Sequence, residues 1–133
     1  MKNAFFLCFI LLITTSLTRC QEHAEENISC LQSFELIENH QNDTNFIIID
    51  LRTDAMFNEE HLENAICHDV FSDDFENWID QFARDKTYLL YCNVGHRSGI
   101  ALNKMKEMEF KNLYHLYEGI REWKKQGYKT VKS

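Results

Sequence analysis

The 133-residue sequence contains no proline, only four glycines and no excess of basic residues. Its formal net charge of −7 argues against a nucleic-acid-binding protein, because such proteins usually present a basic face. The sequence also lacks long runs of like charge, repeats and linkers, so it has room for one domain of ordinary size. Its six histidines lack the spacing of metal ligands, and we expect neither a metal nor another cofactor. Because glycine is scarce, the position of two of the four, Gly95 and Gly99, just after Cys92 is informative.

The first twenty residues differ in kind from the rest of the chain. Lys2 precedes the apolar run Ala4–Ile13, and a stretch rich in Thr and Ser follows. This order is typical of a secretory signal peptide, which we assign to residues 1–20. The run is short for a bilayer, so we expect no stable membrane span. We therefore predict an exported protein, periplasmic or secreted, in which residues 21–28 form a short mobile polar lead.

Cysteine usage depends on this export. Cys20 raises the alternative of a lipid anchor, but Arg19 replaces the small uncharged residue that precedes the lipidated cysteine of bacterial lipoproteins, so plain export is favoured. Cys30, Cys67 and Cys92 then remain. An odd number leaves at least one thiol free or paired with another chain. Cys30 and Cys67 could pair with each other, or both could be small buried side chains.

Hydrophobic patterns predict a single α/β domain over residues 29–131. Apolar runs indicate strands at 46–49, around 65–70, at 87–91 and at 113–116. Helical spacing between them is clearest for Phe75, Trp78, Ile79 and Phe82. The expected helix starts are Ser29 or Ser33, Thr53 or Asp54, Ser72–Asp74, and Ser98. Strands that alternate with helices imply a central, mostly parallel sheet with helices on both faces.

The chemistry is expected around Cys92. A buried strand leads into it, a six-residue loop runs to Arg97, and helical spacing starts at Ser98. Free backbone N–H groups and the partial positive charge of a helix start stabilise a thiolate there, and Arg97 adds a permanent charge. We therefore predict that Cys92 is a catalytic nucleophile. The residues expected to bind the substrate are Asn93, Val94, Gly95, His96, Arg97 and Ser98.

Asp50 and Arg52 form a second polar pair, at the end of the predicted 46–49 strand. The carboxyl ends of strands are where α/β sheets place their sites. We expect this pair to be a structural ion pair that supports the loop, and His61 to be a packed, hydrogen-bonded histidine.

Taken together, these residues resemble the rhodanese (sulfurtransferase) family in its small single-domain form. The resemblance rests on three segments in order: the C-x-x-G-x-R-S loop of Cys92–Ser98, the D-x-R…F…H segment of Asp50–His61, and the closing G…W…G-Y segment of Gly119–Tyr128. It covers roughly residues 29–130. The sequence has Glu60, Asn64 and Glu118 where the family has glycine, and asparagine tolerates positive φ better than most residues.

The resemblance implies sulfur transfer. A small anionic donor such as thiosulfate would hand its outer sulfur to Cys92, and the persulfide would pass it to a thiol acceptor or to cyanide. The resemblance also implies that six residues from the cysteine to the arginine suit sulfur, whereas related phosphatases use seven. Two alternatives stay open: a cysteine phosphatase or arsenate reductase on the same fold, and a non-catalytic sulfur carrier or redox partner that uses Cys92 in a disulfide.

Overall fold

Strands β2 (Phe46–Asp50) and β4 (Thr87–Tyr91) lie at the centre of a five-stranded sheet in a computed structural model that describes residues 26–133. On one side of this pair lie β5 (Asn112–Leu116) and β1 (Asn27–Ile28), and on the other lies β3 (Ile66–Cys67). The resulting order is β1-β5-β4-β2-β3, and each neighbouring pair is parallel. The predicted α/β fold with a central parallel sheet is confirmed.

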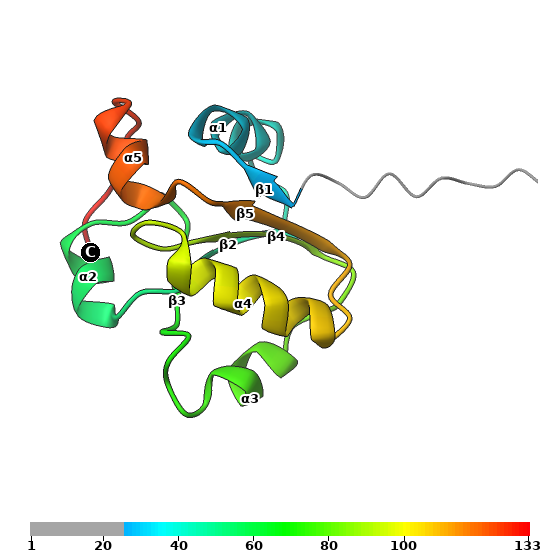
Figure 1. The fold of residues 1–133 in the computed structure, drawn as a ribbon. Coiled ribbons are helices and arrows are strands. Elements are labelled where there is room, and N and C mark those ends of the chain that lie inside the picture. Colours follow the sequence, from blue (N-terminus) through cyan, green and yellow to red (C-terminus); the bar gives the residue numbers. More distant parts are fainter. Residues whose placement is uncertain (1–25) are drawn as a thin grey trace, which may run out of the picture.

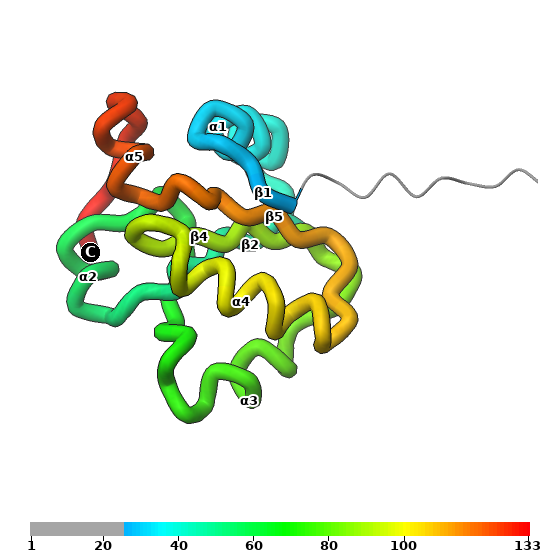
Figure 2. The backbone as a smooth tube through the Cα atoms, in the orientation of Figure 1, coloured from blue at the N-terminus to red at the C-terminus, as the bar shows by residue number. Residues whose placement is uncertain are grey.

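Parallel neighbours require crossover connections, and helices supply most of them. The helices are α1 (Cys30–Asn39), α2 (Asp54–Glu59), α3 (Phe75–Asp80), α4 (His96–Glu107) and α5 (Gly119–Lys125). Helices α1 and α5 cover one face of the sheet, α3 and α4 cover the other, and α2 lies at its edge (Figure 1). In Figure 2 the segments that follow β2, β4 and β5 leave the sheet on the same side, at the carboxyl ends of these strands. Residues just after these strands are thereby gathered at one end of the domain.

The core is divided by the sheet into two layers. Tyr88, Leu90 and Cys92 belong to the cluster under α3 and α4, whereas Leu89 and Tyr91 belong to the cluster under α1 and α5. This division follows from the alternation of side chains along a strand. Because both faces are covered, the central strands are apolar without a break, which is the pattern that identified them.

Most expected elements are present close to their predicted places. The predicted strands at 46–49, 87–91 and 113–116 correspond to β2, β4 and β5, and the one around 65–70 is the shorter β3. Ser29 caps α1 in a capping box with Gln32, and Thr53 caps α2. Helix α3 ends earlier than its apolar spacing suggested, but Phe82 still packs against the core from the turn beyond it.

The expected mobile lead is wrong at its last two residues. Asn27 and Ile28 form β1, in register with His115 and Leu116 of β5. The side chain of Ile28 is buried, so the pairing adds an apolar contact as well as backbone hydrogen bonds. The predicted signal peptide and Cys20 lie outside the described residues. Among residues 26–133, no helix combines the length and the apolar character needed to cross a membrane.

The three departures from glycine are explained by the backbone. Glu60 has a φ of −169°, an extended conformation open to any residue, and its carbonyl accepts a hydrogen bond from Arg52. Asn64 has a φ of 64°, which asparagine tolerates. Glu118 has a φ of −76° and its carboxylate accepts the backbone N–H of Cys30 at 2.6 Å. None of these positions requires glycine in this chain.

Candidate active site

Cys92 follows β4 directly, at the edge of the sheet where the carboxyl ends of the strands meet. Its side chain is on the α4 side and is only 2% exposed. The backbone N–H of Gly95 donates a hydrogen bond to its sulfur at 3.2 Å, and the Ser98 hydroxyl lies 3.3 Å from the same atom. A backbone donor and a hydroxyl that is able to donate therefore converge on one buried sulfur, an arrangement that can stabilise a negative charge there.

The helix after the loop begins earlier than predicted. Gly95 is the N-cap of α4, with a left-handed φ of 91°, and the helix starts at His96. Ser98 lies inside the first turn and is fully buried, so it does not start the helix. Its hydroxyl points back to the sulfur of Cys92 because the turn at Gly95 brings α4 over the end of β4.

The loop is clamped by the segment that follows β5. A Cβ atom on Gly95 would lie 2.1 Å from the carbonyl oxygen of Tyr117, and one on Gly119 would lie 2.2 Å from that of Asn93. The first amides of α5 donate to the loop: Ile120 to the Cys92 carbonyl at 2.9 Å and Arg121 to the Asn93 carbonyl at 3.2 Å. These contacts fix the course of the loop backbone.

The remaining loop side chains line the mouth of the site. Asn93, Val94 and His96 are exposed, and Arg97 is half-buried. The Arg97 guanidinium carbon lies 5.4 Å from the centroid of the Phe71 ring. No ion pair among residues 26–133 includes Arg97, so no carboxylate in this part of the chain neutralises its charge.

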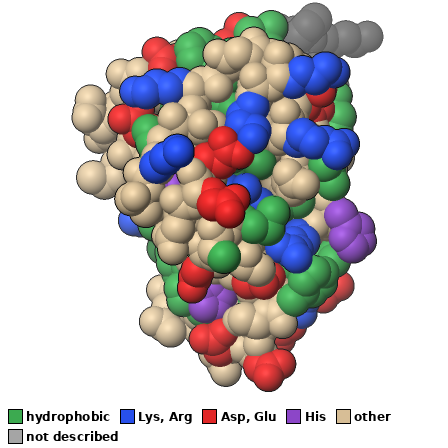
Figure 3. Space-filling model, turned by 90° about the vertical axis from the view of Figure 1, so that its left-hand side faces the viewer, with side chains coloured by type: hydrophobic (Ala, Val, Ile, Leu, Met, Phe, Trp, Pro, Cys, Tyr) green, Lys and Arg blue, Asp and Glu red, His purple; other side chains and the backbone are tan. Residues whose placement is uncertain are grey.

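Figure 3 views the end of the molecule that carries α2, α5 and the Cys92 loop. Acidic and basic side chains are interspersed over this face, without a continuous field of either sign. An anion that enters the site therefore meets local charges such as Arg97, and not a broad basic surface.

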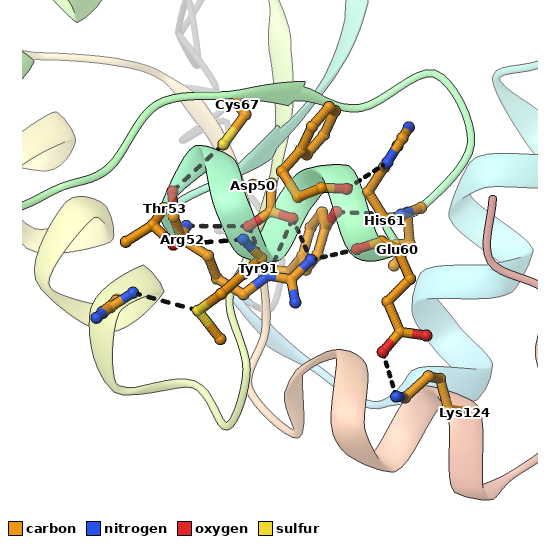
Figure 4. Close-up of polar contacts among 12 residues, drawn as sticks. Asp50, Arg52, Thr53, Glu60, His61, Cys67, Tyr91 and Lys124 are labelled. Carbon is orange, nitrogen blue, oxygen red and sulfur yellow. Dashed lines mark hydrogen bonds and ion pairs between the residues drawn. The ribbon is translucent and has the colours of Figure 1, made fainter. Parts of the chain in front are cut away.

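Asp50 and Arg52 form the expected ion pair, but they are on the other side of the sheet. The Arg52 guanidinium donates hydrogen bonds to both carboxylate oxygens of Asp50, the shortest at 2.8 Å (Figure 4). The side chain of Arg52 is 4% exposed and that of Asp50 is 0% exposed. Arg52 also donates to the Glu60 carbonyl. Tyr91 lies in the same cluster, and its hydroxyl accepts the Leu62 amide at 3.1 Å. The pair ties the end of β2 to the segment after α2 and does not touch the sulfur of Cys92.

Two residues near Cys92, His115 and Asn27, were not predicted from the sequence. The Ser98 hydroxyl lies 2.7 Å from Nε2 of His115, and Nδ1 of His115 lies 2.8 Å from Oδ1 of Asn27. His115 is 5% exposed, and its burial lowers the pKa of the imidazole. A sequence signal did exist: Leu113 faces the α4 layer, so His115, two residues further along the strand, faces it too.

The other described cysteines are neither paired nor placed in a site. Cys30 and Cys67 are free thiols. Burial, helped by nearby carboxylates, raises the pKa of each thiol to about 12. His61 is buried, and its Nδ1 lies 2.8 Å from the Phe57 carbonyl. Residues 26–133 contain no group of three or more His, Cys, Asp or Glu side chains that could hold a metal ion.

Comparison with known proteins gives a consistent result. The model of the rhodanese-like domain family matches residues 33–126. Thiosulfate sulfurtransferase GlpE of Coxiella burnetii is 27% identical over 99 residues, which span 74% of this chain and 87% of that protein. The structure of a rhodanese-related protein from Thermoplasma volcanium has a TM-score of 0.68 at 20% identity, covering 81% of this chain and 99% of the other.

A second structure of the same fold has a different description. It is a Rhodopseudomonas palustris protein of unknown function, described as a possible tyrosine phosphatase, with a TM-score of 0.69 at 20% identity over 80% of this chain and 84% of its own. Likeness at such identities establishes the fold and does not choose between chemistries.

Proposed function

This chain belongs to the rhodanese-like domain family, and from that premise we propose that it is a sulfurtransferase. In this proposal a sulfane sulfur moves from a donor such as thiosulfate to a thiol or cyanide through a persulfide on Cys92. The observation that carries the proposal is the convergence of the Gly95 amide and the Ser98 hydroxyl on the Cys92 sulfur. The same donors can hold a thiolate before transfer and a persulfide anion after it.

The reaction would proceed in two displacements. The Cys92 thiolate attacks the outer sulfur of thiosulfate, a sulfur–sulfur bond forms, and sulfite leaves with the electron pair of the bond that breaks. The cysteine then carries a persulfide anion. A thiolate or cyanide attacks its outer sulfur, and the Cys92 thiolate leaves, which closes the cycle without an external oxidant or reductant.

The loop residues take separate roles in this scheme. The backbone amides of Asn93, Val94, Gly95 and His96 would surround the transferred sulfur and the donor's oxygens, as a helix start does for other anions. The charge of Arg97 would attract the anionic donor. Ser98 would donate its hydroxyl proton to the sulfur. Asp50 and Arg52 would support the fold around the loop without touching the substrate.

Loop length favours sulfur over phosphate. Cys92 and Arg97 bound a loop of six residues, and the family resemblance associates seven with phosphatases. The Tyr117 and Asn93 carbonyls lie so close to Gly95 and Gly119 that neither position has room for a Cβ atom, which favours this compact loop. A tetrahedral phosphate with its four oxygens needs more room than a single sulfur atom.

A thiosulfate:cyanide assay on the full chain tests the proposal, with Cys92→Ser as the active-site variant and Cys67→Ser as the matched control. We expect thiocyanate from the wild type and from Cys67→Ser, and none from Cys92→Ser. Mass spectrometry after thiosulfate treatment should find one added sulfur atom, on the peptide that contains Cys92.

Two other results would replace the proposal. Absence of both thiocyanate and added sulfur, combined with Cys92-dependent hydrolysis of an aryl phosphate, would identify a phosphatase. Absence of both, combined with a disulfide to Cys92 in peptide maps of protein purified without reductant, would identify a redox partner.

We also propose that the protein is exported, with cleavage of residues 1–20. The order of charged, apolar and small residues at the N-terminus supports this. The intact mass of the protein recovered from outside the cytoplasm is the test. A mass that includes residues 1–20, or recovery only from the cytoplasm, would contradict export, and a mass increased by acyl chains would show lipidation of Cys20.

A further inference from the structure

A row of polar groups runs from the Cys92 sulfur to the edge of the sheet. The Ser98 hydroxyl lies 3.3 Å from the sulfur and 2.7 Å from Nε2 of His115, and Nδ1 of His115 lies 2.8 Å from the amide oxygen of Asn27. The row crosses three elements: α4 supplies Ser98, β5 supplies His115 and β1 supplies Asn27. It starts at the reacting atom and ends at an exposed residue.

Burial gives this row its importance. Ser98 is fully buried and His115 is 5% exposed, so neither can exchange its partners for water. Buried polar groups are costly unless they are hydrogen-bonded, and here each satisfies the next. Register maintains the geometry, because Asn27 pairs directly with His115 across the β1–β5 ladder.

Two arrangements of protons along the row connect His115 to the sulfur when the imidazole is neutral, although the Gly95 carbonyl, 3.3 Å from the Ser98 hydroxyl, can also accept its proton. A hydroxyl has one proton to donate, and a neutral imidazole has one donor and one acceptor nitrogen. If Asn27 accepts from Nδ1, then Nε2 accepts the Ser98 proton, and the Ser98 oxygen is left facing the sulfur as an acceptor. That form suits the thiol of Cys92, which can donate its own proton.

A negatively charged sulfur needs the opposite form. Nε2 must then carry the proton and donate it to the Ser98 oxygen, which frees the Ser98 proton to point at the sulfur. Nδ1 becomes an acceptor, and Asn27 meets it by presenting its NH2 group in place of its oxygen. An asparagine can supply either, since its amide contains both a donor and an acceptor.

We propose that His115 is a positioning residue which, through Ser98, directs a hydrogen bond to the Cys92 sulfur whenever that sulfur is a thiolate or a persulfide anion. That the anion can be a persulfide rests on the proposed sulfur transfer, whereas the effect of His115 on the thiolate does not. His115 does not contact the substrate in this scheme. Its effect is transmitted by one hydroxyl group, so removal of that hydroxyl should abolish it.

The surroundings of His115 allow this reversal. Burial is the main cause of the lowered pKa of the imidazole, the Gly95 backbone opposes the shift, and the Lys106 ammonium adds to it. Lys106 forms an ion pair with Glu26, the residue whose backbone carbonyl accepts the His115 amide. Burial thus favours the neutral imidazole, which is the state in which its two nitrogens can exchange the roles of donor and acceptor.

Alkylation of Cys92 by iodoacetamide tests the proposal, because the reaction follows the thiolate and needs no sulfur transfer. Rates are measured from pH 5 to 9 on the full chain, and peptide mass mapping assigns the label to Cys92. We compare His115→Leu, His115→Gln and the control His61→Leu, which alters a second buried histidine that has no contact with Cys92.

We expect His115→Leu to lower the rate at pH 7 by up to about tenfold, because the Ser98 hydroxyl, no longer oriented by Nε2, can give its proton to the Gly95 carbonyl 3.3 Å away and not to the sulfur. Its rate should also reach half-maximum at a higher pH. His115→Gln should recover most of the rate, because its amide can donate to Ser98, and His61→Leu should react like the wild type. In a Ser98→Ala background, His115→Leu should have no further effect.

An unchanged rate in folded His115→Leu overturns the proposal, and so does a His115→Leu effect that persists in full in Ser98→Ala. If His115→Leu does not fold, Asn27→Leu takes its place at an exposed position: it must slow alkylation, and must not do so in Ser98→Ala. If the alkylation rate depends on His115 but the protein forms no persulfide, the positioning role of His115 is retained and the sulfurtransferase proposal is rejected.

Discussion

Two glycines with the same backbone conformation allow the rigidity of the Cys92 loop to be measured. Gly95 has a φ of 91° and Gly127 a φ of 86°, so alanine is strained at both. Their surroundings differ: a Cβ at Gly95 would lie 2.1 Å from the Tyr117 carbonyl oxygen, whereas a Cβ at Gly127 would meet nothing within 4 Å. The pair Gly95→Ala and Gly127→Ala therefore separates the cost of the conformation from the cost of the contact.

The expected magnitudes follow from these distances. A left-handed conformation costs an L-residue about 1–2 kcal/mol, which is the full expected loss for Gly127→Ala. Gly95→Ala adds an overlap with a backbone atom, and relief of such overpacking costs about 1–3 kcal/mol more. Each kcal/mol lowers the melting temperature of a domain of this size by roughly 4–8 °C. The two variants should thus melt several degrees apart.

Urea unfolding of both variants, followed by tryptophan fluorescence, provides the free energies, and Cys92 alkylation provides the functional effect. We expect Gly127→Ala to react with iodoacetamide at the wild-type rate. Gly95→Ala should react at least tenfold more slowly, because movement of the loop withdraws the Gly95 amide from the sulfur. Equal destabilisation by the two substitutions, with equal alkylation rates, would refute the argument that Tyr117 clamps the loop.

Two further predictions concern the surroundings of the loop. Arg52→Met should destabilise the domain by about 3–5 kcal/mol in urea unfolding, because it leaves the fully buried Asp50 carboxylate without its cation. The control Lys125→Met, which alters an exposed ion pair, should change the free energy of unfolding little. Similar losses in the two variants would show that the buried pair is not structural. The thiols of Cys30 and Cys67 have pKa values raised from 9.0 to about 12, so the unfolded state loses these protons first and stability should fall as the pH rises above about 9. Cys67→Ala should reduce that fall, and an undiminished fall would show that Cys67 does not contribute to it.

The parts of the fold that were predicted are those in which the sequence signal is local. The runs that became β2 and β4 are apolar without interruption, because helices cover both faces of the sheet. Strand β1 could not be found in this way. It has two residues, too few for any periodicity, and it exists because β5 offers a free edge with which it pairs.

The same distinction applies to the candidate site. The loop from Cys92 to Arg97 is contiguous in the sequence, so its chemistry could be proposed from residue types and spacing. His115 and Asn27 reach the site from other strands, through a pairing between residues 88 positions apart. Ser98 was predicted both to bind the substrate and to start the helix, since a serine at a helix start normally bonds to the backbone. The left-handed Gly95 moves the start of the helix to His96 and turns Ser98 inward.

The closing segment of the family pattern also acquires a physical meaning from this site. Gly119 is needed because a side chain there would strike the Asn93 carbonyl, and its neighbours Ile120 and Arg121 hold the carbonyls of Cys92 and Asn93 with their amides. With the loop backbone held by α5 in this way, the Gly95 amide is placed to donate to the sulfur. The preceding position has no such constraint, and its Glu118 instead holds the first amide of α1. Two motifs that lie far apart in the sequence thus form one structure, in which α5 sets the shape of the loop and the loop sets the environment of Cys92.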